Sequence, residues 1–227
     1  RKQWLHELGN LVSLRHPNIT FVYDAFEAQD TFYLVIERCE GDLAGLIGHP
    51  DVEAQSWLPY LARDILQALD FIHRNGYAHK DLHPGNVFTG TVRDRMFPGK
   101  APVVVFKVGD LGISRLETEI NVMNTILAQW MLPPEAIDAR YGVIGRAVDI
   151  YHAGLLFLIL LIGTIPEFSA KEILAGEPRQ IAESVRSPYG PPIARALRRH
   201  VAYRTPSAIE LWKDLFAAVP RVPHPAV

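Results

Sequence analysis

Apolar residues near the start of the chain recur with the spacing of an amphipathic helix. Trp4, Leu8, Leu11 and Val12 fall on one helical face. Pro17 interrupts this pattern, because proline disfavours helical geometry in the residue before it. The sequence therefore predicts a first helix that ends before residue 17.

Two β-rich runs follow this helix. Residues 20–26 and 31–36 are rich in aromatic and β-branched side chains and are separated by a short polar turn, which predicts a hairpin. After a bend that contains Gly41, the pattern becomes mainly helical. We expect a small α+β piece over residues 1–41 and a larger, mainly helical piece over residues 42–227.

The longest helical stripe begins near residue 58. Its apolar members are Leu58, Leu61, Ile65, Leu69 and Ile72. Asn75-Gly76 supplies a left-handed stop. Short strands are expected at residues 87–88 and 103–108, with a surface loop over residues 90–101 between them. Helices separated by glycine- and proline-rich joints are expected in the last third of the chain.

Composition narrows the class of protein. The 227 residues are 48% hydrophobic and 21% charged, with a net charge of -2, which is typical of a soluble globular chain. No basic excess favours a nucleic-acid partner, and we interpret the basic run of Arg195, Arg198, Arg199 and His200 as the solvated face of a helix. The single cysteine, Cys39, cannot form an internal disulfide, which fits a reducing compartment and a cytoplasmic location.

One strongly apolar segment needs a separate interpretation. Residues 153–165 form a run shorter than the roughly 18 to 20 residues that span a bilayer. Asp149 and His152 come just before it. We therefore expect a buried core helix and no membrane partner.

The candidate chemistry lies in two short segments. Residues 79–86 read His-Lys-Asp-Leu-His-Pro-Gly-Asn, and residues 108–112 read Val-Gly-Asp-Leu-Gly. Phosphoryl transfer needs a carboxylate near the incoming hydroxyl and oxygen ligands for Mg²⁺. Asp81 fits the first role, and Asn86 and Asp110 fit the second. Each alone is more typical of a turn or strand end than of a site, but the three in this order favour a site.

His79 and His83 suggest a competing zinc site. They are four residues apart with Asp81 between them. Pro84 makes the segment irregular, so the same-face geometry of a helical zinc pair does not apply. We favour the magnesium interpretation.

The two segments resemble the catalytic loop and the metal-binding loop of protein kinases, with Lys80 in place of an arginine and Leu111 in place of a phenylalanine before Gly112. The resemblance implies an α+β, bilobal fold with a truncated small lobe, and it implies ATP, Mg²⁺ and a protein substrate. Asp81 would be the catalytic base. His83 would replace a lysine that touches the transferred phosphate, as a weaker cation.

The resemblance also implies supporting roles around these loops. His79 would be an internal packing and hydrogen-bonding residue against Leu111. Lys80 could pair with a phosphate on the segment after Gly112, as a point charge and not as a bidentate fork.

Three further elements extend the resemblance downstream. Pro133-Pro134-Glu135 is similar to the Ala-Pro-Glu motif, Asp149 to the aspartate that begins the central helix, and Arg204 to the arginine that pairs with the motif's glutamate. The segment His83-Pro84-Gly85-Asn86 is also similar to the sequence of aminoglycoside-type phosphotransferases. Such small-molecule kinases generally lack the three downstream elements, so we favour the protein kinase.

The small lobe is similar in part. Glu7 would be the helix glutamate that pairs with the ATP-anchoring lysine. Ile36 would be the gatekeeper, Glu37 and Cys39 would belong to the hinge that grips adenine through backbone groups, and Phe88 would form the floor of the adenine pocket. These roles rest wholly on the resemblance.

The resemblance begins only at the first helix. No glycine-rich G-x-G-x-x-G loop occurs, and Lys2 is misplaced to serve as the ATP-anchoring lysine. We expect a fragment that needs further small-lobe strands, from an upstream segment or another domain, and that is weakly active or inactive alone. The leading hypothesis is a serine/threonine protein kinase. The alternatives are a pseudokinase module that binds partners and a small-molecule phosphotransferase.

Overall fold

The computed structural model describes residues 14–29, 31–47, 49, 53–93, 95–96, 99, 101–110, 115–116 and 131–218. The strands are β1 (Val22–Ala28), β2 (Thr31–Ile36), β3 (Gly41–Asp42), β4 (Tyr77–Ala78), β5 (Val87–Val92), β6 (Val103–Val108) and β7 (Arg115–Leu116). The α-helices are α2 (Leu43–Ile47), α3 (Leu58–Arg74), α4 (Pro134–Ile137), α5 (Ala147–Ile162), α6 (Ala170–Ala175), α7 (Glu177–Ser184), α8 (Gly190–Ala196) and α9 (Ala208–Ala218). Within the described residues, short 3₁₀ turns lie at Ala54–Trp57, Pro84–Asn86, Ala139–Tyr141 and Val201–Tyr203. This order confirms the predicted α+β class.

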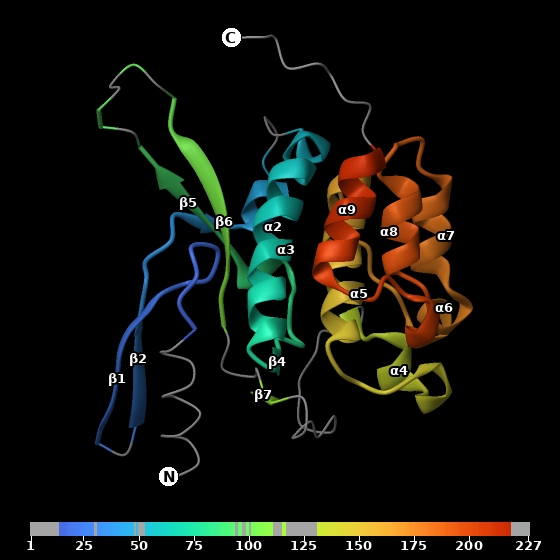
Figure 1. The fold of residues 1–227 in the computed structure, drawn as a ribbon, viewed down its shortest axis with the longest axis horizontal. Coiled ribbons are helices and arrows are strands. Elements are labelled where there is room, and N and C mark those ends of the chain that lie inside the picture. The colour runs from blue at the N-terminus through green and yellow to red at the C-terminus, as the bar shows by residue number, and fades with distance from the viewer. Residues whose placement is uncertain are drawn as a thin grey trace.

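The expected hairpin is present as β1 and β2, which pair antiparallel with Val22 opposite Ile36 and Ala28 opposite Thr31. It lies on the far side of the β5–β6 sheet from the helices (Figure 1). Residues 18–20 tie its entry to β6 through backbone hydrogen bonds of 2.8 and 2.9 Å with Val108. The hairpin is thus joined to the rest of the described chain through its two ends.

The second sheet has the strand order β3-β5-β6. Its β5 and β6 strands are antiparallel, in register from Val87 opposite Val108 to Val92 opposite Val103. The predicted surface loop over residues 90–101 is therefore wrong for Gly90 to Val92, which continue the strand. The glycine suggested a break, but the β-branched residues that follow it pair with valines of β6.

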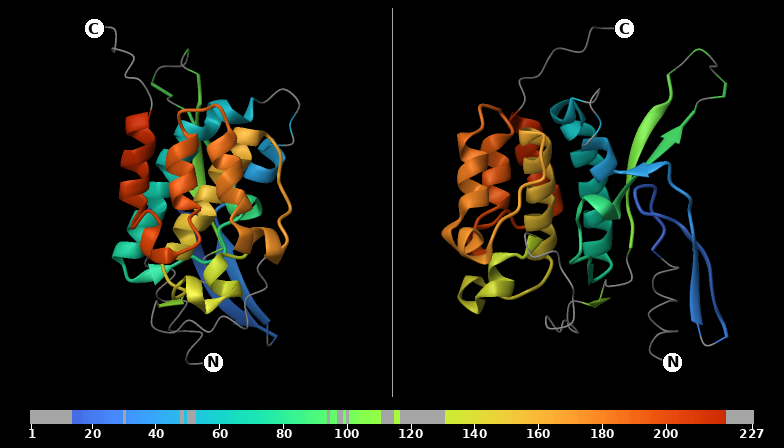
Figure 2. Two further views of the ribbon diagram at one scale, coloured as in Figure 1. Left: turned by 90° about the vertical axis from the view of Figure 1, so that its right-hand side faces the viewer. Right: turned by 180° about the vertical axis from the view of Figure 1, so that it is seen from behind.

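Helix α3 forms the centre of the molecule. It packs against β6 on one side and against α5 and α9 on the other (Figures 1 and 2). Its predicted stripe is fully buried, and α5 is buried along almost its whole length, as expected for a core helix. Helix α5 ends at Gly163, whose φ of 71° is left-handed. None of the helices in the described ranges has the length and apolarity to cross a membrane.

The interpretation of the basic run as one solvated helical face is wrong. Helix α8 ends at Ala196, so of this run only Arg195 is helical. Arg198 and Arg199 follow the helix, and their guanidinium groups donate to the carbonyl oxygens of Tyr203 and Leu174. These two arginines help to fix the turns around α8.

Candidate active site

Asp81 and Asn86 are joined directly by hydrogen bonds. Asp81 lies between β4 and the 3₁₀ turn that ends at Asn86, and both residues are buried. The amide nitrogen of Asn86 donates to the Asp81 carbonyl at 2.9 Å and lies 3.4 Å from its Oδ2 atom. Because Asp81 takes the amide nitrogen, the amide oxygen of Asn86 is the atom left for a metal ion.

The metal-binding loop meets this turn through Gly109. Its N–H donates to the Asn86 carbonyl at 2.9 Å, and its own carbonyl accepts from His79 Nε2 at 2.9 Å. Asp110 follows with a φ of 54°, an uncommon left-handed conformation for a non-glycine residue, and it is exposed. The residue before Asp110 is thus joined to the turn that holds Asp81 and Asn86, which places the two loops side by side.

The loop of residues 79–86 is held in place by Asp149, the third residue of α5. Its carboxylate accepts from the backbone N–H groups of His79 and Lys80 at 2.8 and 2.6 Å and bonds His73 Nε2 at 2.7 Å. Complete burial opposes ionisation of Asp149. Its contacts, of which the hydrogen bond and the charge of His73 are the largest, outweigh burial and lower the pKa of Asp149. An ionised Asp149 therefore fixes the backbone of the two residues that precede Asp81.

Lys80 adopts an unusual conformation at this point. The φ of Lys80 is 67°, and the residue is only 7% exposed. A left-handed non-glycine residue costs about 1 to 3 kcal/mol, which the Asp149 bond to its N–H helps to offset. Lys80 thus takes part, through its backbone, in the contacts that hold residues 79–86 in place.

His83 faces the Asp81 carboxylate. Its Nδ1 atom accepts from the N–H of Gly85 at 3.1 Å, which places the proton of the neutral ring on Nε2. Nε2 lies 3.9 Å from Asp81 Oδ2, and the side chain is 33% exposed. The neutral imidazole can therefore donate a hydrogen bond at this place without carrying a charge.

A cavity of about 470 Å³ lies beside these loops, at the end of the hairpin. Its lining residues are Thr20, Ile36, Glu37, Arg38, Cys39, Glu40, Gly41, Asp42 and Phe88. All four residues that the resemblance assigns to the nucleotide are among them. Phe88 is two residues beyond Asn86 on β5, so this strand links the cavity to the metal-ligand candidates. The volume lies in the usual range for small-molecule sites.

The residues present fit both expected ligands. The amide oxygen of Asn86 and the carboxylate of Asp110 are hard oxygen donors of the type that Mg²⁺ prefers. The cavity combines apolar walls from Ile36 and Phe88 with backbone groups of the hinge, which suits a flat heterocycle with polar edges.

Glu135 and Arg204 form a fully buried ion pair. Two parallel hydrogen bonds of 2.7 Å join the guanidinium to the carboxylate, and both side chains are 0% exposed. Arg204 also donates to the carbonyl oxygens of Ala147, Arg198 and Arg199. The pair therefore ties α4 to the start of α5 and to the segment after α8.

Three predicted site residues, Glu7, Leu111 and Gly112, lie outside the described residues. Their roles stay predictions.

Two supporting residues were missed by the sequence analysis. Asp64 of α3 is 2% exposed, and its carboxylate accepts from the N–H of Phe106 in β6 at 2.9 Å. His73 bonds Asp149 from the end of the same helix. Each is a polar residue on the apolar face of α3, and a polar position within such a stripe is the pattern that could have identified them.

Comparisons with known proteins show the family to which the chain belongs. The family model described as protein kinase domain matches residues 1–221. Calcium-dependent protein kinase 8 of Arabidopsis thaliana is 31% identical over 163 residues, which are 70% of this chain and 28% of that protein. The carbon catabolite-derepressing protein kinase of Candida albicans is 28% identical over 166 residues, 70% of this chain and 24% of that protein.

Serine/threonine-protein kinase ATG1a of Arabidopsis thaliana is 27% identical over 169 residues, which are 73% of this chain and 25% of that protein. The chain therefore spans about a quarter of the length of these curated relatives. Because the family model covers nearly the whole sequence, the chain belongs to the protein kinase domain family.

Proposed function

We propose that this protein transfers the γ-phosphate of ATP to a serine or threonine hydroxyl of a protein substrate. The observation that carries the proposal is the hydrogen bond of 2.9 Å from the Asn86 amide to the Asp81 carbonyl, in a turn that also bonds Gly109 beside Asp110. This arrangement holds a base and two metal-ligand candidates on adjoining loops. Kinase relatives whose names specify serine/threonine substrates support the choice of hydroxyl.

Asp81 is the proposed base. Its carboxylate orients the substrate hydroxyl and accepts the proton as the hydroxyl oxygen bonds to the γ-phosphorus, while the bond from that phosphorus to the bridging oxygen breaks. The contact with Asn86 fixes the carboxylate before the substrate arrives. His83 directs its Nε2 proton toward the same region and can donate to a phosphate oxygen.

Asn86 and Asp110 are the proposed holders of Mg²⁺. When bound, the ion supplies positive charge that neutralises the phosphate oxygens during transfer. The two residues come from a buried turn and an exposed loop that share a backbone hydrogen bond. We infer that Ile36, Glu37, Cys39 and Phe88 bound the adenine, since all four line the cavity.

The hairpin of the small lobe has an exposed apolar surface that further strands would cover. Several large apolar side chains of the hairpin are exposed, among them Tyr23 at 63%, Leu34 at 47% and Ile36 at 50%. Within the described residues β1 and β2 pair only with each other, and an unpaired sheet edge with exposed apolar side chains is a template for further strands. We propose that further small-lobe strands, from this protein or a partner domain, pair with the hairpin and carry the phosphate-binding lysine that Glu7 would meet.

A transfer assay tests the proposed function. The protein, together with the segment or partner domain that supplies the further small-lobe strands, is incubated with labelled ATP, Mg²⁺ and either a peptide array or an aminoglycoside panel. We expect labelling of serine or threonine, and D81N should lower the rate about 10²- to 10⁴-fold. D214N removes a carboxylate that pairs with Arg195 on the helical side and serves as the matched control.

The other outcomes distinguish the alternatives. Labelling of aminoglycosides without peptides would establish a small-molecule phosphotransferase. Binding of partners without any thermal shift from Mg-ATP would establish a pseudokinase. Either result would refute the proposed reaction.

A further inference from the structure

We propose that the ion pair between Glu37 and Lys107 is a positioning device that sets the nucleotide cavity in place relative to Asp110. This inference rests on the proposed function and adds to it two interacting side chains, of which Lys107 belongs to no site described above. Below, the Glu37–Lys107 pair is called the hinge ion pair, and residues 37–40 are called the hinge.

The hinge ion pair has close geometry on both oxygens. Lys107 Nζ lies 2.7 Å from Glu37 Oε1 and 2.8 Å from Oε2. The two side chains are 19% and 25% exposed, so solvent screens them less than it screens a surface pair. Such a contact can hold two segments that are 70 residues apart in the sequence.

Glu37 also closes the base of the hairpin. Its Oε2 atom accepts from the N–H of Phe21 at 3.1 Å, and its own N–H donates to the Phe21 carbonyl at 2.7 Å. Phe21 precedes β1, and Glu37 follows β2. One carboxylate thus joins the entry of the hairpin, its exit and β6.

Lys107 connects this junction to the catalytic elements. It lies directly opposite Phe88 in the β5–β6 ladder, so both side chains project from the same face of the sheet. Phe88 lines the cavity, and Lys107 is three residues before Asp110. Strand β6, which leads into the proposed metal ligand Asp110, therefore also carries the cation that holds the cavity wall.

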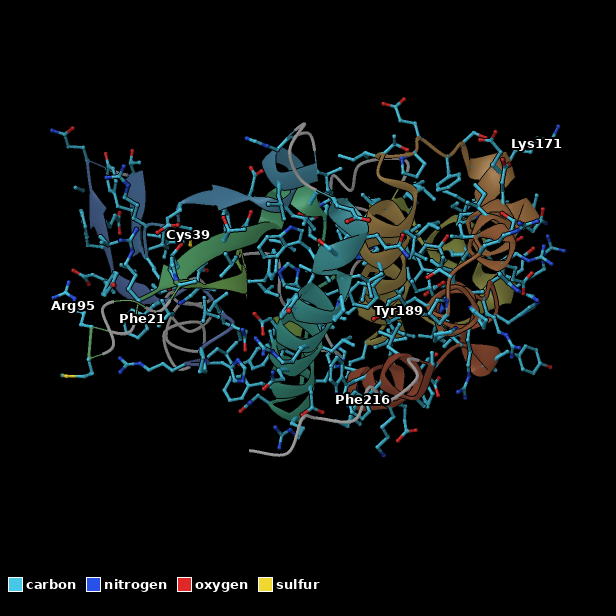
Figure 3. All side chains as sticks on the ribbon, turned by 90° about the horizontal axis from the view of Figure 1, so that it is seen from above. Phe21, Cys39, Arg95, Lys171, Tyr189 and Phe216 are labelled. Carbon is cyan, nitrogen blue, oxygen red and sulfur yellow. The ribbon has the colours of Figure 1, made fainter. Side chains whose placement is uncertain are left out.

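The charges of the pair act on the cavity wall itself. Cys39 lines the cavity, and burial raises the pKa of its thiol, with Glu37 adding to the rise and Lys107 opposing it. In Figure 3, Phe21 and Cys39 lie on the hairpin side of the molecule, far from Lys171 and Tyr189 on the helical side. The pair is therefore placed to act on nucleotide binding.

Loss of the pair should affect binding more than the chemical step. Without Lys107, the Glu37 carboxylate keeps the Phe21 N–H as its donor within the part of the chain that the structure describes, and the hinge is held to β6 by fewer contacts. Asp81 and Asn86 keep their own hydrogen bonds in the turn. We therefore expect a change in the affinity for ATP and a nearly unchanged rate at saturation.

The experiment compares K107M with K107R and with K213M. Arginine preserves the charge and matches a carboxylate, so K107R should behave like the parent. K213M makes the same lysine-to-methionine change in a surface pair of α9, Lys213–Glu210. The measurements are the dissociation constant for Mg-ATP, the transfer rate at saturating ATP and amide hydrogen exchange of the hinge.

We expect K107M to weaken Mg-ATP binding about tenfold, the scale of a charge-assisted contact, with the saturated rate within about twofold of the parent. The amides of Glu37 and Glu40, which donate to Phe21 and Thr89, should exchange about tenfold faster. K213M should change none of these values.

Two results would overturn the inference. Unchanged affinity and unchanged hinge exchange in K107M would show that the pair positions nothing. A lower melting temperature with both values unchanged would make it a purely structural contact. If the parent itself binds no Mg-ATP, the proposed function fails, and hinge exchange alone decides whether the pair holds the hinge.

Discussion

The carboxylate of Asp149 accepts a hydrogen bond of 2.8 Å from the backbone N–H of His79, although 70 residues separate them in the sequence. The same carboxylate bonds the N–H of Lys80 and the ring of His73. The catalytic loop is thus fixed by a buried charge on the central helix, and not by its own short strand alone.

D149N should therefore weaken both stability and transfer. The amide offers one oxygen where the carboxylate offers two, and because His79 and Lys80 donate to different oxygens, the NH₂ group would face one of these two N–H donors. We expect a loss of about 3 kcal/mol in the free energy of unfolding, as for other broken buried charge networks. Urea denaturation measures the loss, and D214N, which removes a partly exposed carboxylate, should stay within about 0.5 kcal/mol of the parent.

The buried pair of Glu135 and Arg204 predicts strong coupling between the two residues. R204M leaves the Glu135 carboxylate buried without its partner and should cost about 3 to 5 kcal/mol. The double variant E135M/R204M should be less destabilised than R204M, because no unpaired charge remains. R195M, in the exposed pair with Asp214, is the control and should cost at most about 1 kcal/mol. Additive effects of the two single changes in a double-mutant cycle would contradict this coupling.

Stability should fall in mild acid because of His152. Burial lowers the pKa of His152 to about 4, despite the opposing effects of Asp149 and of the Met131 carbonyl that its Nε2 bonds at 2.9 Å; the charges of His79 and Arg204 add to the decrease. The unfolded chain binds this proton near pH 6.5, so the free energy of unfolding should fall from about pH 6.5 to about pH 4, by up to about 1.4 kcal/mol per pH unit.

H152Q removes the titration and keeps a donor for the Met131 carbonyl. Its free energy of unfolding should vary less with pH than that of the parent between about pH 6.5 and pH 4. Burial also lowers the pKa of His16, so H16Q serves as a second variant from which one histidine titration is removed, for comparison with H152Q. Parallel curves for H152Q and the parent would refute the assignment to His152.

Gly109 leaves no room for a side chain. A Cβ atom there would lie 2.3 Å from the Phe88 ring and 3.1 Å from Thr20 Oγ1. G109A should therefore displace Phe88, weaken Mg-ATP binding and cost about 1 to 3 kcal/mol of stability. F88L/G109A should recover stability. G99A is the control, because no atom of the described residues lies within 4 Å of a Cβ at Gly99.

His83 should tolerate replacement by another neutral donor. Gly85 fixes the ring with its Nε2 proton toward Asp81, so the proposed role is donation and not charge. We expect H83Q to keep more transfer activity than H83L, which has no donor, with the rate of H83L lower by about tenfold or more. Equal rates for the two variants would remove His83 from the site.

Much of the fold could be predicted from periodicity. The stripe of α3, the β1–β2 hairpin and the buried helix α5 depend on local patterns of apolar residues, which neighbouring positions largely determine. The loop predicted over residues 90–101 was wrong from Gly90 onward, because pairing with valines of β6 outweighed the local preference of a glycine. The prediction that the basic run forms one face of a helix was wrong because α8 ends before Arg198.

The sequence by itself determined which side chains are available for chemistry, since Asp81, Asn86 and Asp110 and their spacing are fixed by the chain. Only the tertiary structure decided what holds them, through contacts such as Asp149 with His79, Asp64 with Phe106 and Glu37 with Lys107. These partners are far apart in the chain, and a charge or donor finds its partner only when packing of the core helices and strands brings the two segments together.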